Sequence, residues 1–217
     1  MALDVAVIGG HGKVALRLLR LLSERGDRAR GLIRNAAHAA DVEAAGATAV
    51  GADVENLTAD SLAREIAGVD AVVFAAGAGA GSGAARKRTV DYGGAAKLID
   101  AARMNDISRY LMVSAIGVNQ PERWSEEMRP YLQAKADADA DLAGSGLEYT
   151  IVRPGGLTDD PGTGMVAAAE SLERYGRIPR DDVAATLVAC LDQRGTIGKA
   201  FDLLSGDVPI GEALARL

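Results

Sequence analysis

The sequence predicts an α/β protein built on a doubly wound parallel sheet. Its 217 residues suit one domain of that class. Short apolar runs alternate with longer amphipathic segments, and a glycine-rich turn follows the first apolar run. Alternating strands and helices imply right-handed crossovers and a sheet covered by helices on both faces. We therefore expect a single domain over residues 1–217.

Six apolar runs have the length and composition of buried strands, and five segments between them have helical spacing. The expected strands are residues 3–8, 29–33, 47–53, 70–76, 109–115 and 148–154. The expected helices are residues 13–25, 38–45, 61–67, 89–104 and 131–143.

The pattern loosens after Pro154. We expect a short strand at 165–169, a helix at 180–192, a strand at 199–204 and a final helix near 209–216. No linker-like stretch precedes this region. The prediction is that residues 155–217 form a small C-terminal cap on the open end of the sheet, on the substrate side.

The net charge of −6 and the lack of basic clusters beyond Arg86–Arg88 argue against nucleic-acid or membrane partners. We expect a small-molecule substrate and a monomer or homodimer. A single cysteine cannot form an intramolecular disulfide, and no apolar run follows a charged N-terminal region, so a cytoplasmic location is expected. Cys190 shares helical spacing with Val183 and Leu187 and is predicted to be a packed thiol. With only two histidines, no metal site is expected.

The turn after the first predicted strand has the composition of a phosphate-binding loop. Gly9 permits the tight turn, Gly12 allows close approach of a pyrophosphate, and the small Ala15 lets the following helix pack on the strand. The helix N-terminus presents free N–H groups to an anion. The loop residues predicted to bind a dinucleotide are Gly9, Gly10, His11, Gly12, Lys13 and Val14.

The end of the second predicted strand favours NADP over NAD. A NAD site usually has an acidic residue there, whereas this chain has Arg34, which suits a 2′-phosphate. A solvated surface arginine is the plainer alternative. Asp53 and Val54, which close the third expected strand, are predicted to meet the adenine edge.

The fourth predicted strand leads into Ala75, Ala76 and Gly77, small residues that leave room for the ribose and pyrophosphate. These turns together line the switch point between the first and fourth strands.

Tyr131 and Lys135 are four residues apart on a predicted helix and therefore share one face. Hydride transfer to a carbonyl leaves an alkoxide that needs a proton, and a nearby ammonium would help a tyrosine supply it at neutral pH. The alternative is that the Tyr131 ring packs on the core and Lys135 is solvated or grips only the cofactor ribose.

These motifs resemble the short-chain dehydrogenase/reductase superfamily, and more closely its atypical NAD(P)-binding, epimerase/dehydratase-like branch. The resemblance spans the chain: Gly9, Gly12 and Ala15, the FAAGAG segment, TVDYGGAAKLIDAA, YLMVSAIG, YLQAK, TIVRPGGLT, the RDDVA helix start and IGKAFDLLSGDVPI. It implies a Rossmann-type fold that binds NADP. It also implies reductase, dehydrogenase or epimerase-like activity.

Carried over by residue, the resemblance makes Ser114 the substrate-orienting serine, Tyr131 the proton donor and Lys135 its partner. Asp91 stands where other members of the superfamily have an asparagine. The run Arg153, Pro154 and Gly155 resembles the segment that passes the nicotinamide.

Three functions follow from this reading. The first is an NADP-dependent oxidoreductase acting on a small carbonyl or alcohol. The others are an NADP-binding redox sensor without catalysis and an epimerase-like enzyme. Residues 118–129 would form a lid with Trp124 on the pocket, or Trp124 would only anchor a surface loop.

Overall fold

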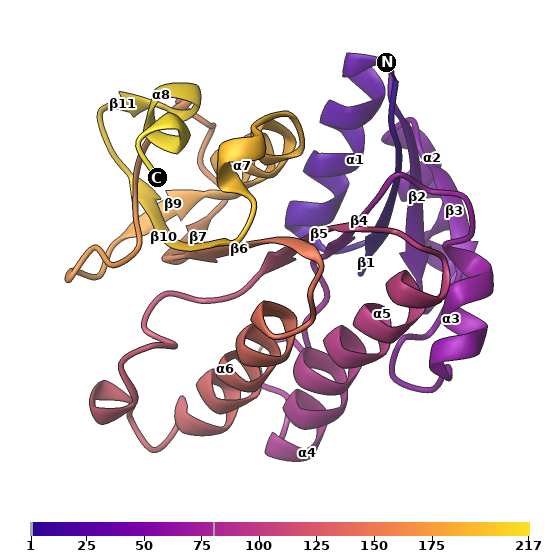
Figure 1. Ribbon diagram of the computed structural model, residues 1–217, viewed down its shortest axis with the longest axis horizontal. Coiled ribbons are helices and arrows are strands. Elements are labelled where there is room, and N and C mark those ends of the chain that lie inside the picture. Colours follow the sequence, from indigo (N-terminus) through magenta and orange to yellow (C-terminus); the bar gives the residue numbers. More distant parts are fainter. Residues whose placement is uncertain (1, 80) are drawn as a thin grey trace.

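The computed structural model describes residues 2–79 and 81–217 and confirms the α/β fold with a mostly parallel sheet (Figure 1). Within these residues the main sheet has nine strands in the order β11-β8-β10-β6-β5-β4-β1-β2-β3. Neighbours from β3 to β10 are parallel, whereas β8 and β11 are antiparallel additions at the edge. The strands are β1 Asp4–Ile8, β2 Arg28–Ile33, β3 Thr48–Gly51, β4 Ala71–Phe74, β5 Arg109–Val113, β6 Glu148–Pro154, β8 Met165–Ala169, β10 Lys199–Ser205 and β11 Val208–Pro209.

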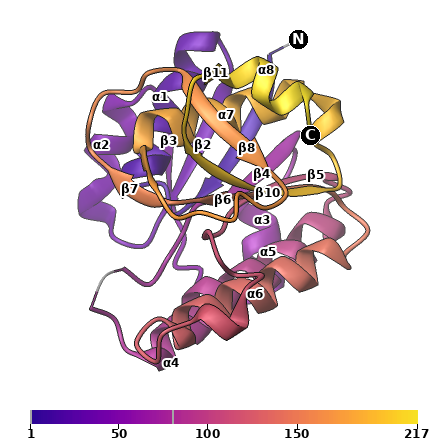
Figure 2. The ribbon, with the colours of Figure 1, turned by 90° about the vertical axis from the view of Figure 1, so that its left-hand side faces the viewer.

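Helices cover both faces of the sheet. One face carries α1 (Lys13–Arg25), α2 (Ala39–Ala44), α7 (Arg180–Asp192) and α8 (Ile210–Ala215). The other carries α3 (Ala59–Glu65), α5 (Gly93–Met104) and α6 (Arg129–Ala143), and α5 and α6 run side by side beneath the sheet (Figure 2). Short helical segments complete the chain: η1 Ala36–His38, α4 Ala84–Arg86, η2 Lys87–Tyr92, η3 Pro121–Arg123 and η4 Arg194–Thr196.

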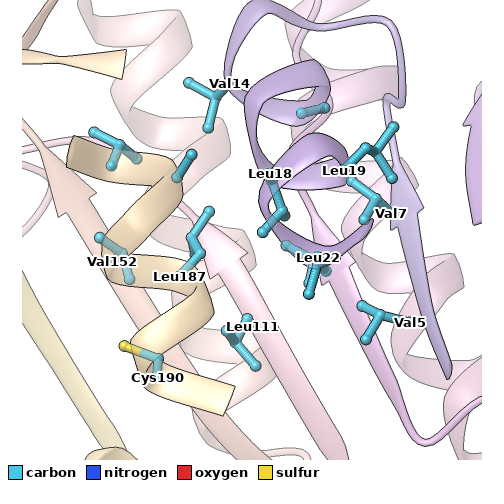
Figure 3. Packing of buried hydrophobic residues seen from close by; sticks show 14 of the residues in the cluster. Val5, Val7, Val14, Leu18, Leu19, Leu22, Leu111, Val152, Leu187 and Cys190 are labelled. Carbon is cyan, nitrogen blue, oxygen red and sulfur yellow. The ribbon is translucent and has the colours of Figure 1, made fainter. Parts of the chain in front are cut away.

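Strand β1 shows why the sheet is buried on both sides. Successive side chains of a strand point to opposite faces. Val5 and Val7 pack against α1, as Figure 3 shows, whereas Ala6 and Ile8 pack against the α3 and α5 side. All four side chains are at most 1% exposed. Burial on both faces is why the sequence reads as a continuous apolar run instead of an alternating one.

The C-terminal region differs from the expected cap. Its strand β10 pairs in parallel with β6, and β8 and β11 extend the same sheet, so this region continues the sheet instead of packing on its open end. Phe201 and Leu203 of β10 are fully buried, which explains the strand's place inside the core. A small second sheet pairs β7 (Gly156–Thr158) with β9 (Arg177–Pro179).

Two expected boundaries also shift. Strand β3 ends at Gly51, which leaves Asp53 and Val54 in the following loop. The helix expected at 89–104 is α-helical only from Gly93, because the preceding η2 segment Lys87–Tyr92 is a π-helix. Such wide turns are found mostly at functional sites, and this one buries Asp91 to 1% exposure.

Cys190 is fully buried in the core between α7 and the sheet (Figure 3). Burial raises the pKa of its thiol to about 12, so the thiol stays protonated and the prediction of a packed cysteine is confirmed. In the described residues, no group of His, Cys, Asp or Glu side chains is placed to hold a metal ion. Over the same ranges, the helices lack the length and apolar composition that crossing a bilayer requires.

Candidate functional site

The glycine loop packs against the start of the neighbouring loop in a way that leaves no space for side chains. Gly9 has φ of +82°, and a Cβ there would lie 2.7 Å from Ala76 Cα. Gly12 is the N-cap of α1, its N–H donates to Gly9 O at 2.7 Å, and it has no side chain to cover the first turn. The free N–H groups of that turn therefore face outward, as an anion site requires.

Two cavities adjoin this loop along the carboxyl edge of the parallel strands. The larger has a volume of about 890 Å³ and the smaller about 300 Å³. Gly12 and Ala75–Ala78 line both cavities and so form the boundary between them. These are residues that the sequence predicted to lie beside the pyrophosphate. This is the arrangement expected for the two halves of a dinucleotide at a switch point.

Most of the predicted cofactor residues line one or both cavities. Those on the larger cavity are Gly12, Lys13, Val14, Ala75, Ala76, Gly77, Lys135, Pro154 and Gly155. Those on the smaller are Gly9, His11, Gly12, Arg34, Asp53, Val54, Ala75, Ala76 and Gly77. Gly10 lines neither: it is buried, donates to Leu32 O at 2.9 Å, and a Cβ there would meet Gly31 Cα at 2.7 Å. Its role is to let the loop pack on β2.

The smaller cavity has a mixed charge that the sequence did not reveal. Arg34 lines it with a side chain 57% exposed, but its Nη1 lies 4.0 Å from Glu55 Oε2. The expectation that no carboxylate competes at this place is therefore wrong, because Glu55 arrives from the loop after β3. Arg86 also lies beside Glu55, at 3.3 Å, so two guanidinium groups share this carboxylate, while Asp53 adds a second carboxylate to the cavity lining.

Two histidines add to this cavity. His11 from the glycine loop stacks on His38 with ring centroids 3.6 Å apart, and His11 Nε2 lies 2.8 Å from Asp41 Oδ2. Sequence reasoning missed His38, whose only signal was its position shortly after the second strand. By contrast, the Asp53 carboxylate turns into its own loop, where it accepts hydrogen bonds from Glu55 N and Asn56 Nδ2.

The larger cavity brings together all four predicted catalytic residues: Asp91, Ser114, Tyr131 and Lys135. Lys135 is 3% exposed, its Nζ lies 3.4 Å from Asp91 Oδ1, and it donates to Val113 O at 3.1 Å. Asp91 Oδ2 accepts from Ala78 N at 3.1 Å. The pair thus ties α6 to the end of β5 and to the small-residue loop after β4.

Burial has the largest effect on the pKa of the Tyr131 phenol. Burial raises the pKa of Tyr131 above its usual value, and the Lys135 ammonium acts in the opposite direction without reversing the shift. We expected Lys135 to activate the phenol by lowering its pKa; the direction of that contribution is as expected, but burial outweighs it. The phenol therefore carries the proton that a donor needs, and the Lys135 ammonium offsets part of the loss of acidity that burial causes.

Two loops close the cavity. Trp124 is 7% exposed, packs with Val118 and Leu132, and donates from Nε1 to Gly117 O at 2.8 Å. It therefore both lines the cavity and anchors its loop. On the other side, Asp159 binds Lys13 Nζ at 2.6 Å and Arg180 Nη1 at 3.0 Å, so the loop after β7 is fastened to α1 and α7.

The chain belongs to the NAD(P)H-binding family whose model matches residues 9–194. It is 46% identical over 216 residues to a Bacillus subtilis protein called uncharacterized sugar epimerase YhfK, covering 99% of this chain and all of that one. A putative NAD-dependent epimerase/dehydratase from Bacillus halodurans superposes over the whole of both chains with a TM-score of 0.94 and 38% identity.

A crystal structure of the oxidoreductase ylbE from Lactococcus lactis covers 99% of this chain and 96% of its own, with a TM-score of 0.87 and 29% identity. The chain is therefore an NAD(P)-binding protein of the atypical oxidoreductase and epimerase-like class. The residues that line both cavities fit such a group, since the first turn of α1 presents N–H groups that no side chain of the N-cap Gly12 covers.

Proposed function

We propose that this protein is an NADP-dependent oxidoreductase that interconverts a small carbonyl compound and its alcohol. The observation that carries the proposal is the larger cavity. Its lining includes Gly12 and Ala75–Ala78, which it shares with the smaller cavity, and also Ser114, Tyr131 and Lys135. A cofactor of this family supplies or accepts the hydride when bound. The protein's own task is then to hold the substrate oxygen and to deliver a proton to it.

The three side chains divide that task. Tyr131 is a neutral phenol within the cavity and serves as the proton donor. Ser114, 3% exposed at the end of β5, orients the substrate oxygen and stabilises the charge that develops on it. Lys135, fixed by Asp91, holds a positive charge beneath the phenol.

Replacing Arg34 with Ala tests the proposed NADP preference. We expect NADPH affinity to fall roughly tenfold, because a charge-assisted contact to a 2′-phosphate is lost, while NADH affinity changes little. Replacing His38 with Ala should weaken NADPH in the same selective way by a smaller factor. Fluorescence titration of both cofactors measures these affinities.

Arg20→Ala is the matched control, because Arg20 is an exposed arginine on α1 that lines neither cavity. Equal loss of NADPH and NADH affinity in Arg34→Ala would contradict the assigned role. Unchanged affinity for both would do so as well.

A redox sensor is the second candidate, and the exposed apolar side chains at the cavity favour it. Met128 is 43% exposed and Tyr175 63% exposed, and both line the larger cavity. Incubation with NADPH and a panel of aldehydes, ketones and quinones separates the two functions. Consumption of NADPH with formation of alcohol supports the oxidoreductase, whereas tight binding with no consumption across the panel supports the sensor.

A further inference from the structure

A buried charge cluster extends from the candidate catalytic residues into the core. We define it as Asp91, Lys135, Asp139, Arg153 and Asp202. Asp139 lies one turn after Lys135 on α6, is 5% exposed, and accepts from Arg153 Nε at 2.8 Å through Oδ2. Arg153 on β6 is the direct register partner of Asp202 on β10, which is 1% exposed. Sequence analysis named Asp91 and Lys135 as candidate catalytic residues and Arg153 only as part of the nicotinamide segment, and it missed Asp139 and Asp202.

The cluster contains three carboxylates and two cations. If all five groups were ionised, one negative charge would remain uncompensated away from water, and burial makes such a charge costly. Burial raises the pKa of both Asp139 and Asp202, although Arg153 opposes the shift at each. Asp139 and Asp202 are therefore easier to protonate than exposed aspartates.

Two polar atoms at the junction with the active site have no hydrogen-bond partner in the described part of the chain. They are Ser114 Oγ and Asp139 Oδ1, and both are buried. The two side chains share Arg153 as a neighbour: Ser114 N donates to Val152 O at 2.7 Å, which places Ser114 next to Arg153, and Arg153 binds Asp139. A hydrogen bond between these atoms would satisfy both.

We propose that Asp139 is a positioning residue for Ser114. Its Oδ2 accepts from Arg153, and its Oδ1, when protonated, donates to Ser114 Oγ. The serine then has its own proton free for a substrate oxygen. This inference rests on the proposed function, because it assumes that Ser114 faces that oxygen.

The protonation state of Asp139 controls the direction of its hydrogen bond with Ser114. A hydroxyl has one proton to donate. When Asp139 is ionised, its Oδ1 competes for that proton, and Ser114 is less able to stabilise an oxyanion. When Asp139 is neutral, it becomes the donor and the competition ends. Carbonyl reduction is therefore expected to fall as the pH rises through the titration of Asp139.

Several groups facing Asp139 set the midpoint of that titration. Lys135 and Tyr131 lie on the same helix, Ser114 directly follows β5, and Arg153 approaches from β6 with Asp202 of β10 as its register partner. Asp91, on η2, is held by Lys135. Removing Ser114 deletes a donor to the carboxylate and should raise the midpoint, whereas removing the charge of Asp202 should lower it.

The test is a pH titration of the aspartate carboxyl carbons by NMR in the full chain, with Asp139→Asn used to assign the signal. We expect a midpoint above the ordinary value of about 3.9. Ser114→Ala should raise that midpoint by about one pH unit, the size of one charge-assisted hydrogen bond. Asp202→Asn should lower it. A midpoint that Ser114→Ala leaves unchanged would overturn the proposal, as would an Asp139 that titrates at or below the ordinary value.

Activity provides the second readout, with phenanthrenequinone as the carbonyl probe and NADPH as the reductant. The kcat of the wild type should fall above the Asp139 midpoint. In Asp139→Asn the alkaline fall should disappear, because the amide donates to Ser114 at every pH while its oxygen still accepts from Arg153. Asp137→Asn, two residues away on α6 in an ion pair with Arg88, should keep the wild-type profile. An Asp139→Asn profile that retains the fall would also overturn the proposal.

The two readouts separate the inference from the proposed function. If Ser114→Ala moves the Asp139 midpoint but NADPH is never consumed, the positioning contact stands and the oxidoreductase proposal fails. If NADPH reduces the quinone while the midpoint is indifferent to Ser114, the positioning contact alone fails.

Discussion

Replacing Tyr131 with Phe is expected to reduce kcat by about 10²- to 10⁴-fold, the range over which a general acid usually contributes. The change removes only the phenol oxygen, so packing with Val118, Trp124 and Leu132 should persist. NADPH affinity should stay within about twofold of the wild type. Steady-state kinetics with a reducible carbonyl and fluorescence titration of NADPH measure the two quantities.

Tyr149→Phe is the control for this substitution, because Tyr149 lies on β6 outside both cavities. It should have the wild-type kcat. Normal turnover by Tyr131→Phe would show that another group delivers the proton, and the mechanism proposed for this site would be wrong.

Replacing Lys135 with Met is expected to have the largest effect on stability. It leaves the Asp91 carboxylate, whose side chain is 1% exposed, without its cation. Breaking a buried pair by removing one partner costs about 3–5 kcal/mol, which corresponds to a fall in Tm of about 10 °C for a chain of this size. Thermal unfolding followed by circular dichroism measures the change.

The double variant Asp91→Asn, Lys135→Met separates charge from packing. Its neutral amide should recover most of the lost stability, since the amide oxygen can still accept from Ala78 N. Turnover should stay low, because the ammonium beneath Tyr131 is still absent. A single Lys135→Met variant as stable as the wild type would contradict the buried ion pair.

The fold was predictable because its signals are local. The apolar run of β1, the glycine turn and the helical stripe of α1 follow one another in sequence, and each requires only its neighbours to be understood. The position of the C-terminal strands at the edge of the sheet was less predictable. Phe201 and Leu203 show that β10 is buried, but periodicity cannot tell whether a buried strand joins the main sheet or caps it.

Contacts within one local motif of the candidate site could be predicted from the sequence. Contacts between distant segments could not. Tyr131 and Lys135 share a helix face, so their proximity follows from spacing. Glu55 reaches Arg34 from another loop. Asp139 meets Arg153 from a different element. These contacts depend on the register of β6 and β10 and on loop paths, which no local pattern encodes. The net direction of the Tyr131 pKa shift required knowledge of burial for the same reason.

Transfer of the label from NADPH deuterated at the reactive carbon tests the central claim most directly. In a single turnover with an accepted carbonyl compound, the account predicts oxidised cofactor and an alcohol that carries the deuterium, at a rate that Tyr131→Phe strongly reduces. A tightly bound cofactor that keeps its deuterium across the carbonyl panel would contradict the account. A product inverted at one carbon with no net oxidation of the cofactor would also contradict it, and would indicate an epimerase.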